Sequence, residues 1–423
     1  MRKNDIIVVF LLVLFLICVT FIYLMIHNFF KTRNLKETRQ DFVETSTNFN
    51  INFIKNVDEN REENYLISPY SVEIALSMLK EGASQSTYDE IEKVSPSRNI
   101  PVLNIPNRIQ TANALFVKNA YKKTVKTSFT NTLKNKYLSE IIYDDFHSPQ
   151  VINDWVNTKT NGMIDHLLDD ISKDFVLGLA NALALDIEWK EPFDCINTKK
   201  EEFHGLYENF YVPMMNHTYE SNARYIHTEQ EEGVILPYKS YDSLGEISSK
   251  DDYLEFIGIM PKNDLHEYIQ NLTLDQIKRF TNSSKAASHH LWIQLSLPRY
   301  TYDYDMKDFK NVLIKMNIQE AFDQDKANFS NIIDPMVERL YISKAIHKTY
   351  IDLNEKGTKA AAVTYFGLDK ATAIMEKPEI VSIIFDQPFI YMIRDHKTEE
   401  ILFFGVLYEP IKWTESTRQC IEE

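Results

Sequence analysis

The sequence predicts one large domain of the α+β class, and two patterns support this prediction. Apolar residues recur at helical spacing in the first half of the chain, most clearly over residues 71–81. Apolar, β-branched and aromatic runs follow in the second half, at residues 292–297, 380–385, 389–393 and 401–407. Helices early in the chain and strands late are typical of an α+β domain with much antiparallel sheet. Because no Pro/Gly/Ser-rich linker, repeat or low-complexity tract interrupts residues 46–411, we expect a single domain there.

The composition excludes several classes of function. The chain has 423 residues and a formal net charge of −15, from 61 acidic and 46 basic side chains. A surface this acidic repels phosphate backbones, so we expect no nucleic-acid partner. With 10 glycines the sequence contains no GxGxxG, Walker or GxSxG motif, and we predict neither a cofactor nor catalytic residues. The three cysteines, Cys18, Cys195 and Cys420, indicate no disulfide framework and no zinc-ligand spacing, so no metal is predicted.

The first 45 residues are interpreted as a tail (1–5), a membrane span (6–26) and a charged connector (27–45). Residues 6–26 carry no charge and as a helix would be roughly 30 Å long, enough to cross the hydrocarbon core of a bilayer. A cleaved signal peptide, which would make the protein secreted, is the alternative. The apolar run exceeds a usual signal-peptide core, and no small-x-small cleavage site follows it. We therefore predict a single-pass membrane protein with an uncleaved signal-anchor.

The side of the membrane on which the body lies stays open at this point. The basic residues within 31–39 outnumber Arg2 and Lys3, which favours a cytoplasmic body under the positive-inside rule. Four Asn-x-Ser/Thr sequons favour an extracellular or lumenal body, although so many asparagines yield roughly four sequons by chance. The sequons lie at Asn216, Asn271, Asn282 and Asn328.

A series of short motifs lies along the chain between about residue 46 and about residue 411. It includes residues 64–72 (NYLISPYSV), 113–117 (NALFV), 152–156 (INDWV), 189–193 (WKEPF), 212–215 (VPMM), 236–238 (LPY), 297–300 (LPRY), 343–348 (SKAIHK) and 385–391 (FDQPFIY). In sequence and in order, these motifs resemble the serpin family of protease inhibitors. Any one of them is moderate support, whereas the ordered set is specific.

The resemblance implies a serpin fold, with helices, three β-sheets and an exposed reactive loop at about residues 355–384, followed by a C-terminal tail over 412–423. It implies a monomer that inhibits serine endopeptidases, or cysteine endopeptidases across class, by inserting the cut loop into its central sheet. The alternative is a non-inhibitory serpin acting as a membrane-tethered binding protein. The Asn-, Ile- and Tyr-rich, Gly-poor composition also suggests a poxvirus-type origin and a role in modulating host defence.

The segment after Glu355 is similar to the serpin hinge, although its alanines alone would equally suit a helical turn. A strand entering the middle of a sheet must alternate its faces with period two. Starting from Thr358, every second residue is small or apolar, and no proline interrupts the segment before Pro378. Gly357 supplies a pivot without a Cβ. The predicted hinge residues are Glu355, Gly357, Thr358, Ala360, Ala361, Ala362 and Thr364.

Two further groups of residues match serpin positions that hold the sheet ready to open. Ser68, Ser71, Asn181 and His347 correspond to the polar shutter beneath the opening point. The simpler interpretation of these residues is helix capping by the serines and a surface histidine. Trp189, Arg299 and Glu355 correspond to the breach at the top of the sheet, where an Arg–Glu pair would hold the hinge. A plain surface salt bridge there would contribute little.

The family spacing from Glu355 places the scissile bond between Ala371 and Thr372. A shift in register would move the cut, and the residue before the cut selects the protease. Cleavage after Ala371 suits an elastase-like protease, after Lys370 a trypsin-like protease, and after Asp369 a caspase or a granzyme B type.

Overall fold

The computed structural model describes residues 48–59, 61–250, 252–358, 377–415 and 417. Its largest sheet has seven strands, all antiparallel, and its central strands are fully buried. Such strands contain continuous apolar runs rather than alternating ones, because both faces are covered. The strand order is β1 (Tyr65–Ile67), β21 (Ile401–Leu407), β20 (Phe389–Asp395), β13 (Leu254–Pro261), β10 (Glu231–Pro237), β9 (Arg224–His227) and β14 (Lys285–Ala286).

A second sheet carries the strand to which the chain returns after residues 359–376. Strand β19 (Glu379–Ile384) pairs parallel with β15 (Leu291–Pro298), which pairs in turn with β8 (Asn209–Tyr219) and β7 (Lys199–His204). A separate two-stranded ribbon consists of β11 (Ser240–Tyr241) and β12 (Ile247–Ser248).

The third sheet is divided into two ladders. One has the order β16 (Tyr300–Asp305), β17 (Lys348–Asn354), β18 (Gly357–Thr358) and β6 (Ile187–Glu188). The other joins β2 (Asn104–Ile105), β3 (Ile109–Lys118) and β4 (Glu140–Asp144), with β5 (Leu177–Leu185) on β3. Only Asp186 separates β5 from β6, so the two ladders share one long strand.

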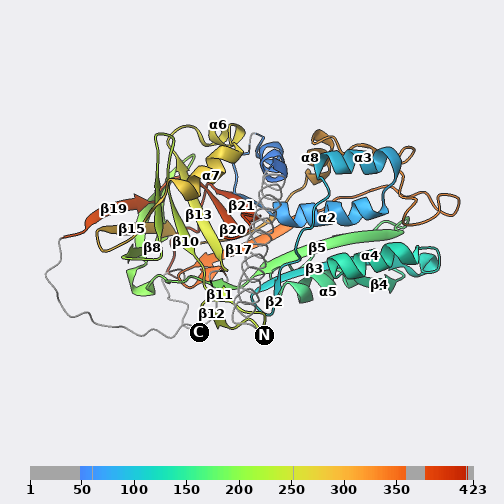
Figure 1. Cartoon of the computed structure of the whole chain (residues 1–423), viewed down its shortest axis with the longest axis horizontal. Helices are drawn as coiled ribbons and strands as arrows, with labels where there is room; N and C mark the ends of the chain where they lie inside the picture. The colour runs from blue at the N-terminus through green and yellow to red at the C-terminus, as the bar shows by residue number, and fades with distance from the viewer. Residues whose placement is uncertain (1–47, 60, 251, 359–376, 416, 418–423) are drawn as a thin grey trace, which may run out of the picture. The chain divides into compact units, whose positions relative to one another are not determined.

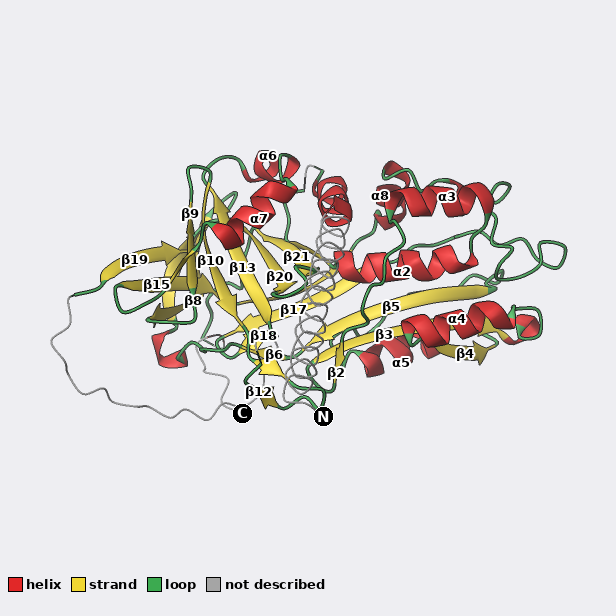
Figure 2. Cartoon of the chain, in the orientation of Figure 1, coloured by secondary structure: helices red, strands yellow, loops and turns green. Residues whose placement is uncertain are grey.

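Helices cover both faces of the β3–β5 ladder (Figure 2). Residues Leu115 and Val117 of β3 belong to the main core with α2 (Pro69–Gly82). Their neighbours Ala114 and Phe116 pack instead with α5 (Gln150–Lys159). The alternation follows from the pleat of the strand. The remaining helical segments are 48–58, α3 (Gln85–Val94), α4 (Thr127–Tyr137), α6 (Leu265–Gln270), α7 (Leu274–Asn282), α8 (Phe309–Lys315) and the 3₁₀ turns η1 (Asn119–Tyr121), η2 (Cys195–Asn197) and η3 (Glu320–Phe322).

The predicted α+β class with several sheets is confirmed, and the expected helix at residues 71–81 lies within α2. The predicted runs at 292–297, 380–385, 389–393 and 401–407 correspond to β15, β19, β20 and β21, with Phe385 just beyond the end of β19. The three expected sheets are present. The third is split into two ladders, and the two-stranded β11–β12 ribbon was not predicted.

The predicted membrane localisation is corrected here. Among the described residues no helix is long and apolar enough to cross a bilayer. Their longest helix, α2, has 14 residues, whereas a span needs about 20. The proposed anchor at residues 6–26 lies outside the described part of the chain, in a separate unit at Met1–Ser46.

Candidate functional site

The split in the third sheet leaves β5 paired on one edge only. Strand β5 is paired with β3 along its whole length, and no described strand pairs with its other edge (Figure 1). Residues 338–347, which lead into β17, form no helix or strand. Both segments line a cavity of about 710 Å³, so the sheet is open at this point. Unpaired backbone groups on such an edge can accept a further strand.

The four predicted shutter residues, Ser68, Ser71, Asn181 and His347, all line this cavity. Ser68 lies at the start of α2, where its Oγ accepts a hydrogen bond from the Ser71 backbone N–H at 3.2 Å. The backbone N–H of Ser68 donates to His347 Nε2 at 3.0 Å. Ser68 therefore acts as a helix cap, as the simpler interpretation proposed, and also contacts the predicted shutter histidine.

Two polar atoms in this cluster have no hydrogen-bond partner among the described residues. They are Ser71 Oγ and Asn181 Oδ1, both inaccessible to solvent. The Asn181 amide nitrogen donates to Asn113 Oδ1 at 2.7 Å, and Asn113 donates in turn to the carbonyl of Tyr137. A buried polar atom without a partner destabilises the fold until something satisfies it.

His347 is buried and neutral in the native protein. Its ring packs against Phe53 and Phe309, with centroid separations of 6.2 and 5.4 Å. Burial lowers the pKa of His347 to about 4, and nearby Asp305 offsets this only in part. The histidine is thus a buried hydrogen-bond acceptor, which contradicts the alternative of a surface histidine.

The predicted breach residues lie at the other end of the opening, where β6 and β18 are paired. Trp189 is buried and stacks on Tyr238, with ring centroids 4.4 Å apart. Its Nε1 donates to the carbonyl of Asn354, and its backbone N–H donates to that of Lys356, each at 2.9 Å. Trp189 is therefore bonded to the chain on both sides of Glu355, through its indole on one side and its backbone N–H on the other.

Arg299 and Glu355 form a buried ion pair, with about 7% of each side chain exposed. Glu355 Oε1 also accepts a hydrogen bond from Thr198 Oγ1 at 2.6 Å. Arg299 Nη1 donates to the carbonyl oxygen of Thr417 at 3.2 Å. Breaking a buried pair of this kind is costly because it leaves a desolvated charge without a partner.

The first described residues of the predicted hinge form a short strand that is paired on both sides. Gly357 and Thr358 form β18, which pairs with Leu353 and Asn354 of β17 on one side and with β6 on the other. Thr358 is buried, and its Oγ1 lies 2.8 Å from the hydroxyl of Tyr238. Gly357 has φ +156°, and an added Cβ would lie 2.1 Å from the carbonyl oxygen of Ile187. Glycine is therefore required where the chain enters the sheet.

The rest of the predicted loop lies outside the described residues. This applies to the hinge residues Ala360, Ala361, Ala362 and Thr364 and to the reactive-bond residues Asp369, Lys370, Ala371 and Thr372.

Several residues of the site were not predicted. Asn113, Thr198, Tyr238 and Thr417 all contact predicted residues through hydrogen bonds between segments far apart in the chain. Asn113 and Tyr238 lie within two of the serpin-like motifs, at residues 113–117 and 236–238. The motifs indicated that these residues matter but not which residues they contact. Cys195 corrects an expectation, because it is disulfide-bonded although three sparse cysteines indicated no disulfide framework.

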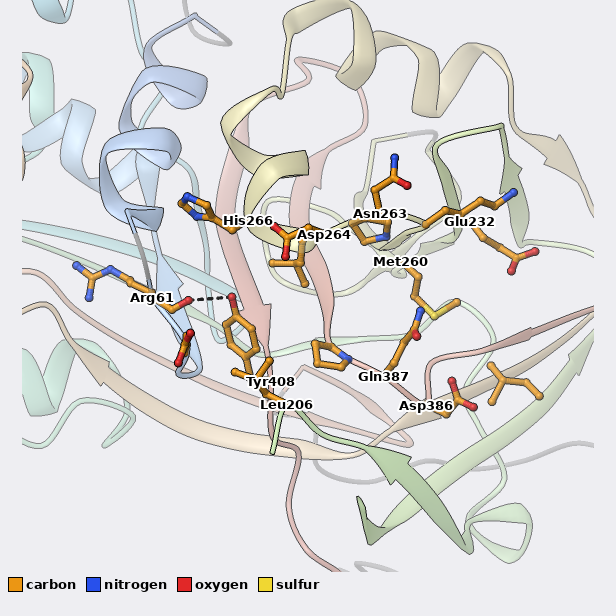
Figure 3. A pocket seen from close by; sticks show the side chains of 16 residues that line it. Arg61, Leu206, Glu232, Met260, Asn263, Asp264, His266, Asp386, Gln387 and Tyr408 are labelled. Atoms are coloured by element: carbon orange, nitrogen blue, oxygen red, sulfur yellow. Dashed lines mark hydrogen bonds between the residues drawn. The ribbon is translucent and has the colours of Figure 1, made fainter. Parts of the chain in front are cut away.

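A second hollow, of about 660 Å³, lies near the end of β13 and the start of α6 (Figure 3). The Tyr408 hydroxyl donates to the Arg61 carbonyl at its rim. Arg61 pairs with Asp308, His266 pairs with Asp58, and Lys262 Nζ donates to the Thr228 carbonyl. All three basic side chains that line the hollow are therefore already bonded within the protein. Its described lining side chains contain no buried polar atom without a partner, and we assign it no ligand.

A comparison of the sequence with protein-family models matches "Serpin (serine protease inhibitor)" over residues 44–410. The chain belongs to the serpin family. An uncharacterized serpin-like protein of Methanosarcina acetivorans is 30% identical over 377 residues, which cover 83% of each chain. The alpha-1-antiproteinase S of Cavia porcellus is 28% identical and covers 84% of this chain and 86% of its own.

Solved structures show the same fold. The thermophilic serpin tengpin in its native state has a TM-score of 0.73 and 28% identity, covering 87% of this chain and 94% of its own. The relatives are archaeal and mammalian, and the predicted poxvirus-type origin is therefore not supported.

The pKa of His347 predicts that the native state loses stability in acid. The folded pKa of about 4 lies below the usual 6.5, so the unfolded chain takes up the proton first as the pH falls. The contribution of His347 is complete above pH 6.5 and is lost as the pH falls towards 4, about 3 kcal/mol in all. We expect the free energy of unfolding, measured by urea titration, to fall over this range. It should fall less in His347→Asn, whereas exposed His290→Asn should behave as the wild type.

The geometry of Gly357 predicts that Gly357→Ala destabilises the breach. The new Cβ would contact the Ile187 carbonyl, so β18 must leave its place between β17 and β6. We expect a loss of about 1–3 kcal/mol in the free energy of unfolding. Gly178→Ala is the matched control, since its Cβ would meet only the movable ring of Phe175, at 3.2 Å. An equal and small effect of the two changes would contradict this account of the hinge.

Proposed function

We propose that this serpin inhibits endopeptidases by inserting its cleaved reactive loop into the open third sheet. One observation carries the proposal most directly: β18 is a two-residue strand paired on both sides at the end of a gap in which β5 has a free edge. Residues that follow Thr358 can continue this strand into the gap. We take residues 46–411 as the serpin domain and about 355–384 as the reactive loop.

The chain would supply the substrate bond and the energy of insertion, and the protease would supply the catalytic groups. The nucleophilic hydroxyl or thiol of the protease attacks the carbonyl carbon of Ala371. The Ala371–Thr372 amide bond breaks, Thr372 leaves as the new amino terminus with the transferred proton, and Ala371 remains as an acyl-enzyme ester or thioester. Insertion of the cut loop then distorts the attached protease before water can hydrolyse this bond.

The polar side chains of the predicted shutter suit such an insertion. Ser71 Oγ and Asn181 Oδ1 lack partners in the described structure and line the gap, so an incoming strand could satisfy them. The residues of the same parity as Thr358 are Ala360, Ala362 and Thr364, which are small enough to be buried there. The loop sequence therefore matches the space that the gap offers.

The residue before the cut identifies the target class. Alanine at this position suits the small pocket of an elastase-like protease. A cut after Lys370 or Asp369 would instead indicate a trypsin-like protease or a caspase or granzyme type.

Incubation of the purified protein with one protease of each class tests the proposal. We expect an SDS-stable complex with an elastase-like protease and a released C-terminal fragment that begins at Thr372, identified by mass spectrometry. Cleavage of the loop by every protease, without a covalent complex and without a gain in thermal stability, would indicate a non-inhibitory serpin.

Thr358→Arg tests the inserting face. An arginine at this position loses the contact with Tyr238 and should displace β18, the strand that insertion must continue, so the inhibitor becomes a substrate. Ala361→Arg is the matched control because Ala361 has the opposite parity and its side chain is expected to face outward. The ratio of complex to cleaved protein on a denaturing gel measures the outcome. Equal loss of complex in both variants would be evidence against this face assignment.

A further inference from the structure

One face of helix α2 lines the gap beside β5, and another face carries buried charges. The residues that line the gap follow helical spacing and include Val72, Ala75, Leu76 and Leu79. Glu73 and Lys80 are also buried, with 0% and 5% of each residue exposed, but they do not line the gap. They are seven residues apart, which places both on one side of the helix, two turns from each other. Charged side chains are rarely buried to this extent unless they are paired.

Arg98, which follows α3, pairs with Glu73 through two hydrogen bonds. Its Nε donates to Glu73 Oε1 at 2.6 Å, and its Nη2 donates to Glu73 Oε2. The same guanidinium pairs with Glu400, with Nη1 3.0 Å from Glu400 Oε2 and Nη2 3.1 Å from Glu400 Oε1. Glu400 lies in the turn between β20 and β21. One arginine therefore lies between two buried carboxylates, and it joins α2 to the β20–β21 hairpin of the seven-stranded sheet.

A second ion pair on the same side of α2 does not balance this charge. Lys80 Nζ donates to the Ser95 carbonyl at 2.6 Å and pairs with Glu92 of α3 at 2.7 Å. The two ion-paired groups together contain three carboxylates and two cations. They therefore carry an excess of one negative charge when every side chain is ionised.

Among the described residues, the other elements packed against α2 do not offset this excess. Strands β5 and β21 contain no titratable side chain. On α4, Lys136 and Tyr137 contact Glu81 in the last turn of α2. The Tyr70 hydroxyl donates to the Pro101 carbonyl at 2.8 Å, and burial raises the pKa of Tyr70 to about 12, so it stays protonated at neutral pH.

A buried excess charge of this kind favours the uptake of a proton. Burial raises the pKa of Glu73 to about 7, while the hydrogen bonds from Arg98 oppose the shift and the charge of Glu400 adds to it. Because the two carboxylates share one guanidinium, the proton belongs to the pair rather than to one residue.

We propose that the Glu73–Arg98–Glu400 cluster is a proton-dependent anchor of α2, which holds the helix firmly when one proton is bound and more weakly when that proton is lost. With the proton bound, the charges balance, and the guanidinium still contacts both carboxyl groups. Without it, an uncompensated negative charge is buried between α2 and the β20–β21 hairpin. A buried charge without a partner destabilises the packing around it.

The anchored helix also carries residues of the predicted shutter. Ser68 caps α2 and contacts His347, and Ser71 lies in its first turn and lines the gap. A helix that is held less firmly opposes the entry of a strand less, so loss of the proton should make loop insertion faster. The proton site is independent of the proposed inhibitory function, whereas its effect on insertion rests on that function.

Urea unfolding of the full chain at a series of pH values tests the proton site. The folded pKa of about 7 lies above the usual 4.5, so the unfolded chain loses the proton first as the pH rises, and the native state loses stability over this range. Relative to Glu73→Gln, the unfolding equilibrium constant of the wild type should rise about fiftyfold between pH 5 and pH 7.5. The titration of His347 is common to both proteins and cancels in this ratio.

Glu81→Gln is the matched control, since Glu81 is the other glutamate of α2 and lies outside the cluster. It should keep the pH dependence of the wild type. If Glu73→Gln folds poorly, Glu400→Gln removes the same excess charge and should also flatten the pH dependence. A ratio to the wild type that stays constant with pH in the folded variant would overturn the proton site.

The rate of spontaneous loop insertion at pH 6 and at pH 8 tests the regulation. The ionised fraction of a group with a pKa of about 7 rises about tenfold between these two pH values. We therefore expect the wild type to convert to the more heat-stable inserted form about tenfold faster at pH 8. Glu73→Gln, or Glu400→Gln in its place, should convert at the same rate at both pH values, and Glu81→Gln should behave as the wild type.

The outcomes separate the two proposals. Equal conversion of the wild type at the two pH values, or no conversion at either, overturns the regulatory role even where urea unfolding reveals the proton site. Absence of SDS-stable complexes with all proteases, together with a pH-dependent conversion rate, would instead overturn inhibition and leave the anchor of α2 intact.

Discussion

The free edge of β5 is the constraint on which the rest of this structure depends. Buried backbone N–H and carbonyl groups need partners, and β5 has them on one side only, from β3. Helix α2 packs on one face of this ladder and α5 on the other, so both faces are covered. The sheet therefore keeps an opening that a strand could fill, and β18 closes only its breach end.

The two ends of this opening are held by different kinds of interaction. At the shutter, His347 and Ser68 contact each other through one neutral hydrogen bond, while Ser71 and Asn181 keep unsatisfied oxygens. Such contacts are individually weak and can be remade around a new strand. At the breach, a buried ion pair and the stacked ring of Trp189 surround Glu355. The described contacts at the shutter are thus neutral hydrogen bonds, whereas those at the breach include a buried ion pair.

Thr417 of the C-terminal tail, which lies beyond the family match, and Thr198, which follows the η2 turn within it, both contact the Arg299–Glu355 pair. Each donates or accepts one hydrogen bond at the same ion pair, although Thr198 and Thr417 are 219 residues apart in the chain (417 − 198). An ion pair is sensitive to its surroundings because its strength depends on how far water is excluded. Described residues of two distant segments therefore both contribute to the surroundings of this ion pair.

The sequence by itself determined the α+β class, the family and the identity of most residues around the opening. These rest on local patterns: helical spacing in α2, apolar runs in β15 and β19 to β21, and ordered motifs that carry Ser68, Arg299 and His347. Glu355 was found through the similarity of the following segment to the serpin hinge. Only the tertiary structure decided that β18 is already paired, that His347 is buried, and that Thr198 and Thr417 reach the breach. The sequence also led to a wrong prediction of localisation and gave no sign of the bonded state of Cys195. The physical reason is that burial, strand pairing and long-range hydrogen bonds depend on which distant segments of the chain contact each other. Local patterns in one sequence do not specify those contacts.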